Sequence, residues 1–251
     1  TLATNITRST PQSKESLKDQ SSHQYQAVMW VADLLYNEGQ TLTNDQILQK
    51  FALGTFFYAT NGNGWSNNSG WLDKTLSECH WNGLSCSTVD SDAVTGLNFA
   101  APNNFVGTLP NELSLLSQLT FLSLFKSPSL TGTLGSILSG EGPASVLETI
   151  RVEWCRMVGS IPTTIGKLTT LVNFIVDGNE LTGTLPNELI FLTKLEVLVV
   201  NDNKFSGTLP SELGNLKNLE YLDMQSNNLT GTIPLDLENL QVLPYSTCFD
   251  S

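Results

Sequence analysis

Cysteines and histidines are the residues of this chain most able to do chemistry, and its 251 residues include only four cysteines and two histidines. A cysteine nucleophile needs a base within hydrogen-bonding reach. Both histidines, His23 and His80, stand near the amino terminus, whereas Cys155 lies far along the chain in a repeated segment. Catalysis through Cys155 is therefore not expected, and we predict that it is a small buried side chain of the core.

The same four cysteines limit which disulfides are possible. Cys79 and Cys86 have six residues between them, so a bridge would close a short loop. The alternative is a pair of reduced thiols in a cytosolic chain, and an apparent secretory context favours the bridge. Cys155 and Cys248 are four repeats apart, which is about 19 Å of stacked strands, whereas bridged Cα atoms lie within about 7 Å. They are not expected to pair, and the partner of Cys248 stays open.

Motifs of catalysis and cofactor binding are missing from the sequence. It contains no H-E-x-x-H, no G-x-S-x-G, no Walker loop and no dinucleotide fingerprint. Acidic side chains are common, but they lack the spacing of an EF-hand calcium loop. We therefore expect neither an enzyme nor a protein that carries a metal or another cofactor.

The charge balance narrows the class of partner. There are 24 acidic against 12 basic residues, for a formal net charge of −12. Such a chain repels a phosphate backbone and an anionic membrane surface, so we expect no nucleic-acid partner. The acidity indicates either high solubility or a site for a cation or a basic partner. No run of 18 apolar residues or more is present and no signal peptide is visible, so a membrane anchor would lie outside this chain.

A repeat of 24 residues begins at Val94 and dominates residues 94–251. Four glycines, at positions 159, 183, 207 and 231, follow one another at this spacing. In the unit "LVNFIVDGNELTGTLPNELIFLTK", apolar residues at offsets 0, 3 and 5 should point inward around a short strand. The asparagine at offset 8 should hydrogen-bond the turn that leaves the strand. Each unit is too thin to bury its own apolar face, so six to seven units are predicted to stack into a solenoid.

Residues 23–93 are predicted to form a helical cap on this solenoid. Apolar residues recur at helical spacing between positions 24 and 36. A second helix should begin at a capping box formed by Thr43 and Gln46 and end before the turn-rich "NGNGW". Residues 1–22 are polar and are expected to be a flexible tail or stalk.

The letters "LTGTLP" and "LTGTIP" resemble the plant-type extracellular leucine-rich repeat, and this resemblance covers nearly everything after residue 22. The segment "ECHWNGLSC" is similar to the amino-terminal cap of that family, where paired cysteines flank W-x-G. The upstream helices look like the preface of many diatom leucine-rich repeat proteins. The resemblance implies an α/β, right-handed solenoid with a disulfide in its cap, in a protein that is secreted or displayed on the cell surface.

Strand residues that alternate with the inward leucines should line the concave side, which is the usual binding surface of a solenoid. Large aromatics in adjacent repeats, aliphatic neighbours and an acidic region together suit a protein, peptide or glycan ligand. The alternative is that these side chains only pack against one another. The candidate residues are Phe125, Arg151, Glu153, Trp154, Ile175, Asp177, Val199, Asn201, Asp202, Asp223 and Gln225.

Two other functions stay open at this stage. The chain could be a structural or adhesive protein of a wall or matrix, in which the repeats are a spacer and glycans matter. Asn5, Asn67 and Asn228 lie in N-x-S/T sequons and are candidates for glycosylation. The chain could instead bind ice or a mineral through regular hydroxyl rows, although threonine also suits a strand on the flank of a repeat. These rows are Thr108, Thr133, Ser160, Thr184, Thr208 and Thr232, with Thr131, Thr182, Ser206 and Thr230 beside them.

Overall fold

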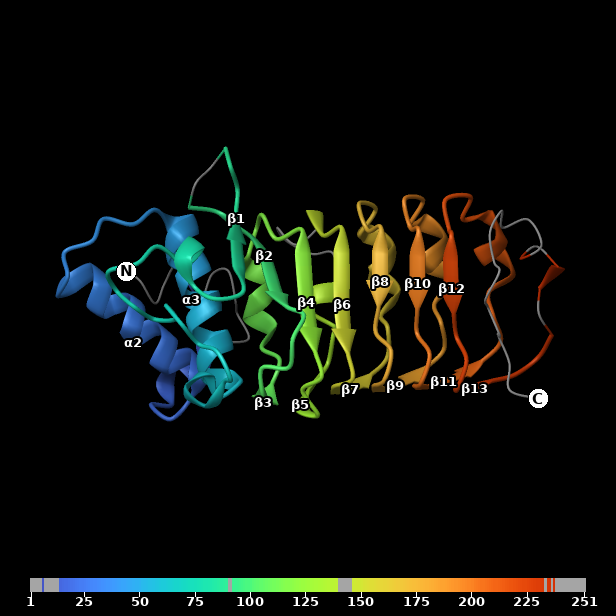
Figure 1. Cartoon of the computed structure of the whole chain (residues 1–251), viewed down its shortest axis with the longest axis horizontal. Coiled ribbons are helices and arrows are strands. Elements are labelled where there is room, and N and C mark those ends of the chain that lie inside the picture. The colour runs from blue at the N-terminus through green and yellow to red at the C-terminus, as the bar shows by residue number, and fades with distance from the viewer. Residues whose placement is uncertain are drawn as a thin grey trace.

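The computed structural model describes residues 6, 14–89, 92–139, 146–232, 234, 235 and 237. Two helices, α2 (His23–Tyr36) and α3 (Asn44–Ala59), lie at the amino-terminal end, and strands follow one another along the long axis from there (Figure 1). This is the architecture that the repeat predicts, a solenoid of stacked units with a helical region in front. Asn5 and Cys248 lie outside the described residues. Within them, no helix is both long and apolar enough to cross a membrane.

A seven-stranded sheet forms the larger face of the solenoid, and its strands are parallel except for β1, which pairs antiparallel with β2. The register places Leu122, Ile150, Phe174, Leu198 and Leu222 in one row across the sheet, and all five are fully buried. Since a strand alternates its side chains, the residues on either side of this row point away from the core. The strands are β1 (Leu84–Cys86), β2 (Val94–Phe99), β4 (Phe121–Phe125), β6 (Thr149–Glu153), β8 (Asn173–Ile175), β10 (Val197–Val199) and β12 (Tyr221–Asp223).

A second, six-stranded sheet runs along the flank of the solenoid (Figure 1). Gly159, Gly183 and Gly207 end strands of this sheet, Gly231 lies just beyond its last strand, and all four have positive φ, such as 81° for Gly207. A Cβ at Gly207 would lie 2.8 Å from Cγ2 of Thr184 in the preceding repeat, so a side chain there would collide. The strands are β3 (Val106–Thr108), β5 (Ser129–Gly132), β7 (Arg156–Gly159), β9 (Glu180–Gly183), β11 (Lys204–Gly207) and β13 (Asn228–Leu229).

Short 3₁₀ helices lead each unit from the flank back to the next strand of the larger sheet. In four of them the N-cap residue is a proline with φ between −58° and −80° and non-helical ψ, which ends the preceding extended segment. Their leucines and isoleucines, such as Leu189 and Ile165, are buried against the sheet. The helices with this role are η5 (Asn111–Leu115), η8 (Thr163–Lys167), η9 (Asn187–Phe191) and η10 (Ser211–Asn215), and η6 (Ile137–Ser139) lies in the second repeat.

The repeated asparagines connect neighbouring units. Nδ2 of Asn203 donates to the carbonyls of Val176, Val200 and Asn201 at 2.8, 3.2 and 3.1 Å, and its Oδ1 accepts from the N–H of Leu181 at 3.0 Å. Asn179 and Asn227 make the equivalent bonds one repeat to either side. The predicted role of this asparagine in the turn is confirmed.

Cys155 occupies the same position in the third repeat and is a free, buried cysteine. Its Sγ lies 3.4 Å from the carbonyl oxygen of Glu153. Burial raises the pKa of the thiol to about 11. Both features fit the predicted small core residue and not a nucleophile, which must form a thiolate.

We expect Cys155 to be inert towards thiol reagents in the folded protein. In a Cys248→Ser variant it is the one thiol left outside the disulfide, so its labelling can be followed alone. Because the thiol is buried and protonated at about pH 8, labelling should be negligible in buffer and complete after unfolding in guanidinium. Rapid labelling of the folded variant would contradict the structural role.

The cap closes the open end of the solenoid with aromatic side chains. Trp65, Trp71 and Trp81 are buried together against Phe99 of β2, and the ring centroids of Trp65 and Trp71 are 4.8 Å apart. Such clusters stabilise a fold both by burying area and by edge-to-face contacts between rings. The first repeat would otherwise expose its apolar side, so this cluster replaces the missing neighbour.

Local features of the cap match the sequence analysis closely. The predicted bridge is present between Cys79 and Cys86, with their Cα atoms 5.5 Å apart. Thr43 and Gln46 form the predicted capping box at the start of α3. Residues before position 23 also belong to the helical region. Ile6 is fully buried in the core, and a short 3₁₀ helix, η2 (Ser16–Lys18), precedes α2.

Candidate ligand-recognition face

The outward side of the larger sheet and the turn that follows its strands, which we together call the strand face, hold every candidate recognition residue. The strand register sorts its side chains into three rows. The candidates predicted from the sequence lie in the second and third rows and in the turn, and none lies in the first row, although the same alternation predicts that row. The first row is Phe121, Thr149, Asn173, Val197 and Tyr221. The second is Ser123, Arg151, Ile175, Val199 and Asp223. The third starts with Phe125 and Glu153 and continues, beyond the paired strands, through Asp177, Asn201 and Gln225.

The third row is followed by a turn in which the backbone is left-handed. Lys126, Trp154, Asp202 and Ser226 have φ between 47° and 54°, and Gly178 shares this conformation. Backbone hydrogen bonds link successive repeats along this turn, for example from the N–H of Trp154 to the carbonyl of Asp177 at 3.0 Å. A bulky residue in this region is strained, at a cost on the order of 1 kcal/mol.

Trp154 is the most exposed large aromatic of this region, with 47% of its surface accessible. Its indole lies over Gly178, since a Cβ at Gly178 would lie 2.6 Å from Cδ2 of the ring. The neighbouring glycine therefore leaves room for one face of the ring. The predicted exposure of Trp154 agrees with the structure, and the glycine beside it fixes where the ring lies.

Phe125 is less available than Trp154. It is half-buried, and Nζ of Lys126 lies 5.1 Å from its ring centroid, within cation–π range. For Phe125 the side chains of the face do pack against one another, which is the alternative that the sequence left open. Ile175 and Val199 are also half-buried and pair with each other across β8 and β10, and strand β6 separates them from Phe125.

Three candidates that were expected on an open surface are instead buried in the third row. Glu153 and Asp177 each keep 8% of their surface accessible and Asn201 keeps 9%. Partners across the rows account for part of this burial, because Nε of Arg151 donates to Glu153 at 2.8 Å. Nδ2 of Asn201 likewise donates to Asp202 at 2.6 Å. Spacing alone shows which side of the sheet a residue faces, but not what its neighbours cover.

Asp177 differs from the other carboxylates of the strand face. No other residue in the described part of the chain donates a hydrogen bond to it, and only its own backbone N–H does so. Burial and then the negative charge of Glu153 raise the pKa of Asp177 from its ordinary 3.8 to about 6. Asp202 adds to this effect, and the positive charge of Arg151 opposes it.

We expect the substitution Asp177→Asn to stabilise the folded protein at neutral pH. The folded state keeps the Asp177 proton up to about pH 6, whereas the unfolded chain releases it near pH 3.8. The folded state therefore binds more protons in this window, and the stability of the wild type falls as pH rises through it. An amide does not ionise, so the variant should gain about 1–3 kcal/mol over the wild type above pH 6.

Urea unfolding of both proteins at about pH 4 and about pH 8 measures this gain. Comparing variant with wild type at each pH cancels the titration of groups that the two share. A stability difference that is the same at both pH values would show that Asp177 is an ordinary exposed carboxylate.

Comparison with known proteins places the fold. Residues 194–216 and 218–240 match the family described as Leucine Rich Repeat. The ectodomain of the receptor kinase SOBIR1 from Arabidopsis thaliana is 26% identical, with a TM-score of 0.59 over 73% of this chain and 95% of that one. The fold is a leucine-rich repeat solenoid. No curated protein matches the sequence.

Two further solved structures refine this leucine-rich repeat assignment. Pollen Receptor Kinase 3 aligns with a TM-score of 0.63 over 74% of this chain and 89% of that one, and at 23% identity this likeness concerns the fold alone. The plant peptide hormone receptor RGFR1, solved in complex with RGF2, is 34% identical with a TM-score of 0.51. That match covers 56% of this chain and only 22% of the receptor chain. The chain resembles plant leucine-rich repeat receptor ectodomains, and these comparisons do not support the closer resemblance to diatom proteins.

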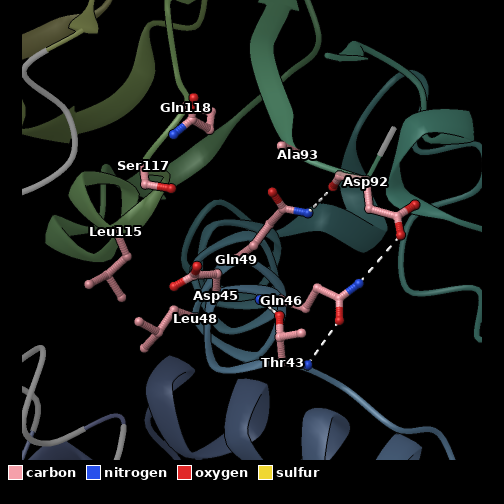
Figure 2. Close-up of a pocket in the computed structure, with 10 residues that line it drawn as sticks. All are labelled: Thr43, Asp45, Gln46, Leu48, Gln49, Asp92, Ala93, Leu115, Ser117 and Gln118. Atoms are coloured by element: carbon pink, nitrogen blue, oxygen red, sulfur yellow. Dashed lines mark hydrogen bonds between the residues drawn. The ribbon is translucent and has the colours of Figure 1, made fainter. Parts of the chain in front are cut away.

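Other parts of the solenoid and its cap offer less for recognition. A hollow of about 610 Å³ lies between the start of α3 and the first repeats, and most of the residues that line it are polar (Figure 2). Two of its three glutamine amides are already engaged, since Gln46 bonds Thr43 and Asp92 while Gln49 donates to the carbonyl of Asp92. These bonds hold α3 against the segment that leads into β2, so the hollow is a packing interface within the cap.

Three other kinds of site were considered from the sequence: a metal site, the hydroxyl rows and the glycosylation sequons. Among the residues that the structure describes, no group of three or more histidine, cysteine, aspartate or glutamate side chains could hold a metal ion. The exposed hydroxyl rows lie along the flank, where the methyl of Thr208 packs against Gly231 of the next repeat. Asn67 and Asn228 are exposed, and both remain predictions as glycosylation sites.

Proposed function

We propose that this leucine-rich repeat solenoid is an extracellular or cell-surface recognition module that binds a peptide through its strand face, the side expected to be concave. The observation that carries the proposal is Trp154. A large aromatic side chain stands exposed on a strained backbone, directly after a buried glutamate. The left-handed turn itself recurs at Lys126, Asp202 and Ser226, so the exposed indole, and not the backbone, sets this position apart. An exposed large apolar group beside polar neighbours is typical of a binding surface.

The surroundings of Trp154 support a ligand that lies across several repeats. Apolar and aromatic side chains from neighbouring strands share its face, among them Ile175, Val199 and Tyr221, and Tyr221 is 42% exposed. Aromatic anchors with adjacent charged groups provide most of the affinity in protein interfaces. A protein or glycan ligand would use the same face, but an extended peptide matches the narrow run of rows best.

The resemblance to a peptide receptor and the disulfide of the cap both support this proposal. RGFR1, a plant peptide hormone receptor, shares 34% identity with the aligned part of this chain. The disulfide between Cys79 and Cys86 is typical of a secreted or cell-surface domain. We extend peptide recognition from that receptor to this chain as a proposal, with the peptide itself to be found.

Selection from a library of random linear peptides displayed on phage tests the proposal. The folded domain should capture peptides that bind saturably and compete with one another. Combining Phe125→Ala with Trp154→Ala should abolish this capture, while thermal unfolding stays close to that of the wild type. Phe191→Ala is the matched control, because Phe191 is an aromatic with 55% exposure on η9, away from the strand face.

Two outcomes of this selection would overturn the proposal. If no peptide is captured saturably, the alternative of a structural or adhesive protein gains support. If captured peptides bind the double variant as well as they bind the wild type, recognition lies elsewhere on the molecule.

A further inference from the structure

We infer that the strand face contains a subsite for one cationic side chain of the bound peptide, an arginine or a lysine, formed by Trp154, Glu153 and Asp177 with Asp202 at its rim. The inference rests on the proposed peptide-binding function and adds the chemistry of one ligand group. It depends on the hydrogen-bond donors and positive charges that are missing around the carboxylates of this face.

The first step concerns hydrogen bonds to the acids. Glu153 is bonded by Arg151, Asp202 by Asn201, and Asp223 accepts from the backbone N–H of Gln225 at 3.2 Å. Asp177 has no donor from another described residue although it is more than nine-tenths buried. A largely buried carboxylate whose one donor is its own backbone N–H is poorly compensated, and a cation with N–H donors would supply the missing hydrogen bonds and charge.

The second step concerns the aromatic ring. Trp154 immediately follows Glu153, and its backbone N–H is bonded to the carbonyl of Asp177, so ring and acids belong to one site. One face of the indole lies over Gly178, and 47% of the residue is open to solvent. A guanidinium or ammonium group over an indole is stabilised by the electron density of the ring, most of all when it is partly desolvated.

The third step concerns charge. The charges that act on Asp177 are the negative ones of Glu153 and Asp202 and the positive one of Arg151. Arg151 already bonds Glu153, and among the described residues no ion pair joins it to Asp177. The chain as a whole carries a formal charge of −12, which accelerates the approach of a basic ligand. A metal ion fits this place poorly, since the described residues form no cluster of three metal-binding side chains. An arginine fits best, because its planar group can stack on the ring and bond a carboxylate together.

The test uses peptides captured from the random library. Each arginine in them is replaced by citrulline, which keeps the shape of the side chain and removes its charge, and each lysine by norleucine. For wild-type protein we expect at least one such replacement to weaken binding about tenfold or more. In Asp177→Asn and in Trp154→Ala, the same replacement should weaken binding by no more than about threefold.

Two checks keep the result interpretable. Asp177→Asn should melt no lower than the wild type, so a loss of preference cannot come from unfolding. Asp45→Asn, which removes an exposed acid from α3, should keep the full preference for arginine or lysine.

The possible failures are distinct. If no peptide is captured, the proposed function is overturned and the subsite with it. If peptides are captured but bind equally well with citrulline or norleucine, the proposed function stands and the cationic subsite is wrong. If the preference for a basic side chain persists in Asp177→Asn, the cation binds elsewhere on the face.

Discussion

Replacing Asn203 by alanine is expected to lower the free energy of unfolding by about 3–5 kcal/mol. The amide makes three bonds to carbonyls of two repeats and accepts one from Leu181, at distances between 2.8 and 3.2 Å. Alanine removes all four bonds, each worth about 0.5–1.5 kcal/mol, and the buried N–H of Leu181 also loses its side-chain acceptor. The carbonyls of Val176, Val200 and Asn201 keep one donor each, from Asn179, Asn227 and the N–H of Gly178. Urea unfolding followed by circular dichroism measures the loss.

A matched control separates the buried network from asparagine in general. Asn218 is exposed and makes one bond, from Nδ2 to the carbonyl of Thr193 at 2.7 Å. Asn218→Ala should therefore cost no more than about 1 kcal/mol. Equal losses for the two variants would mean that the asparagine network does not hold the repeats together.

Replacing Trp154 by alanine is expected to weaken binding of a selected peptide by about 30-fold to 1,000-fold, as is typical of a central aromatic anchor. Stability should change little, since nearly half of the side chain is already exposed. Trp154→Gly should weaken binding as much and yet melt at the same temperature as the wild type or higher, because glycine relieves the left-handed backbone strain. Titration calorimetry and thermal melting of the same preparations measure both quantities.

Lys126→Gly serves as the control for the backbone. Lys126 has φ of 47°, so glycine should relieve similar strain there without removing the aromatic anchor. If Trp154→Gly lost much stability whereas Lys126→Gly did not, the indole would be a structural residue, and its exposure would carry no function.

Much of the fold follows from the sequence because its causes are periodic or local. The leucines at fixed offsets predict the buried row of the larger sheet, and the glycines predict the tight flank. The capping box at Thr43 and the bridge between Cys79 and Cys86 depend on residues close in sequence, so short motifs suffice to find them. Cys155 could be identified as core for the same reason, since its place in the repeat is fixed.

The site itself was only partly predictable. Strand alternation places Glu153 and Asp177 on the outward side, yet their burial depends on side chains from neighbouring repeats. Tyr221 and the rest of the first row were not predicted, although each lies two residues after the leucine that begins its repeat. The left-handed backbone of Trp154 has no signal in its own residue type, and only the glycine at the same position of the next repeat hints at it.

Photo-crosslinking of a selected peptide carrying a benzophenone, followed by mass spectrometry, shows whether a peptide ligand lies on the strand face beside Trp154. We predict crosslinks confined to the rows and turn that run from Phe121 to Ser226, with the densest labelling around Trp154 and Gly178. Crosslinks on the hydroxyl rows of the flank or on helices α2 and α3, with none at Trp154, would contradict this account.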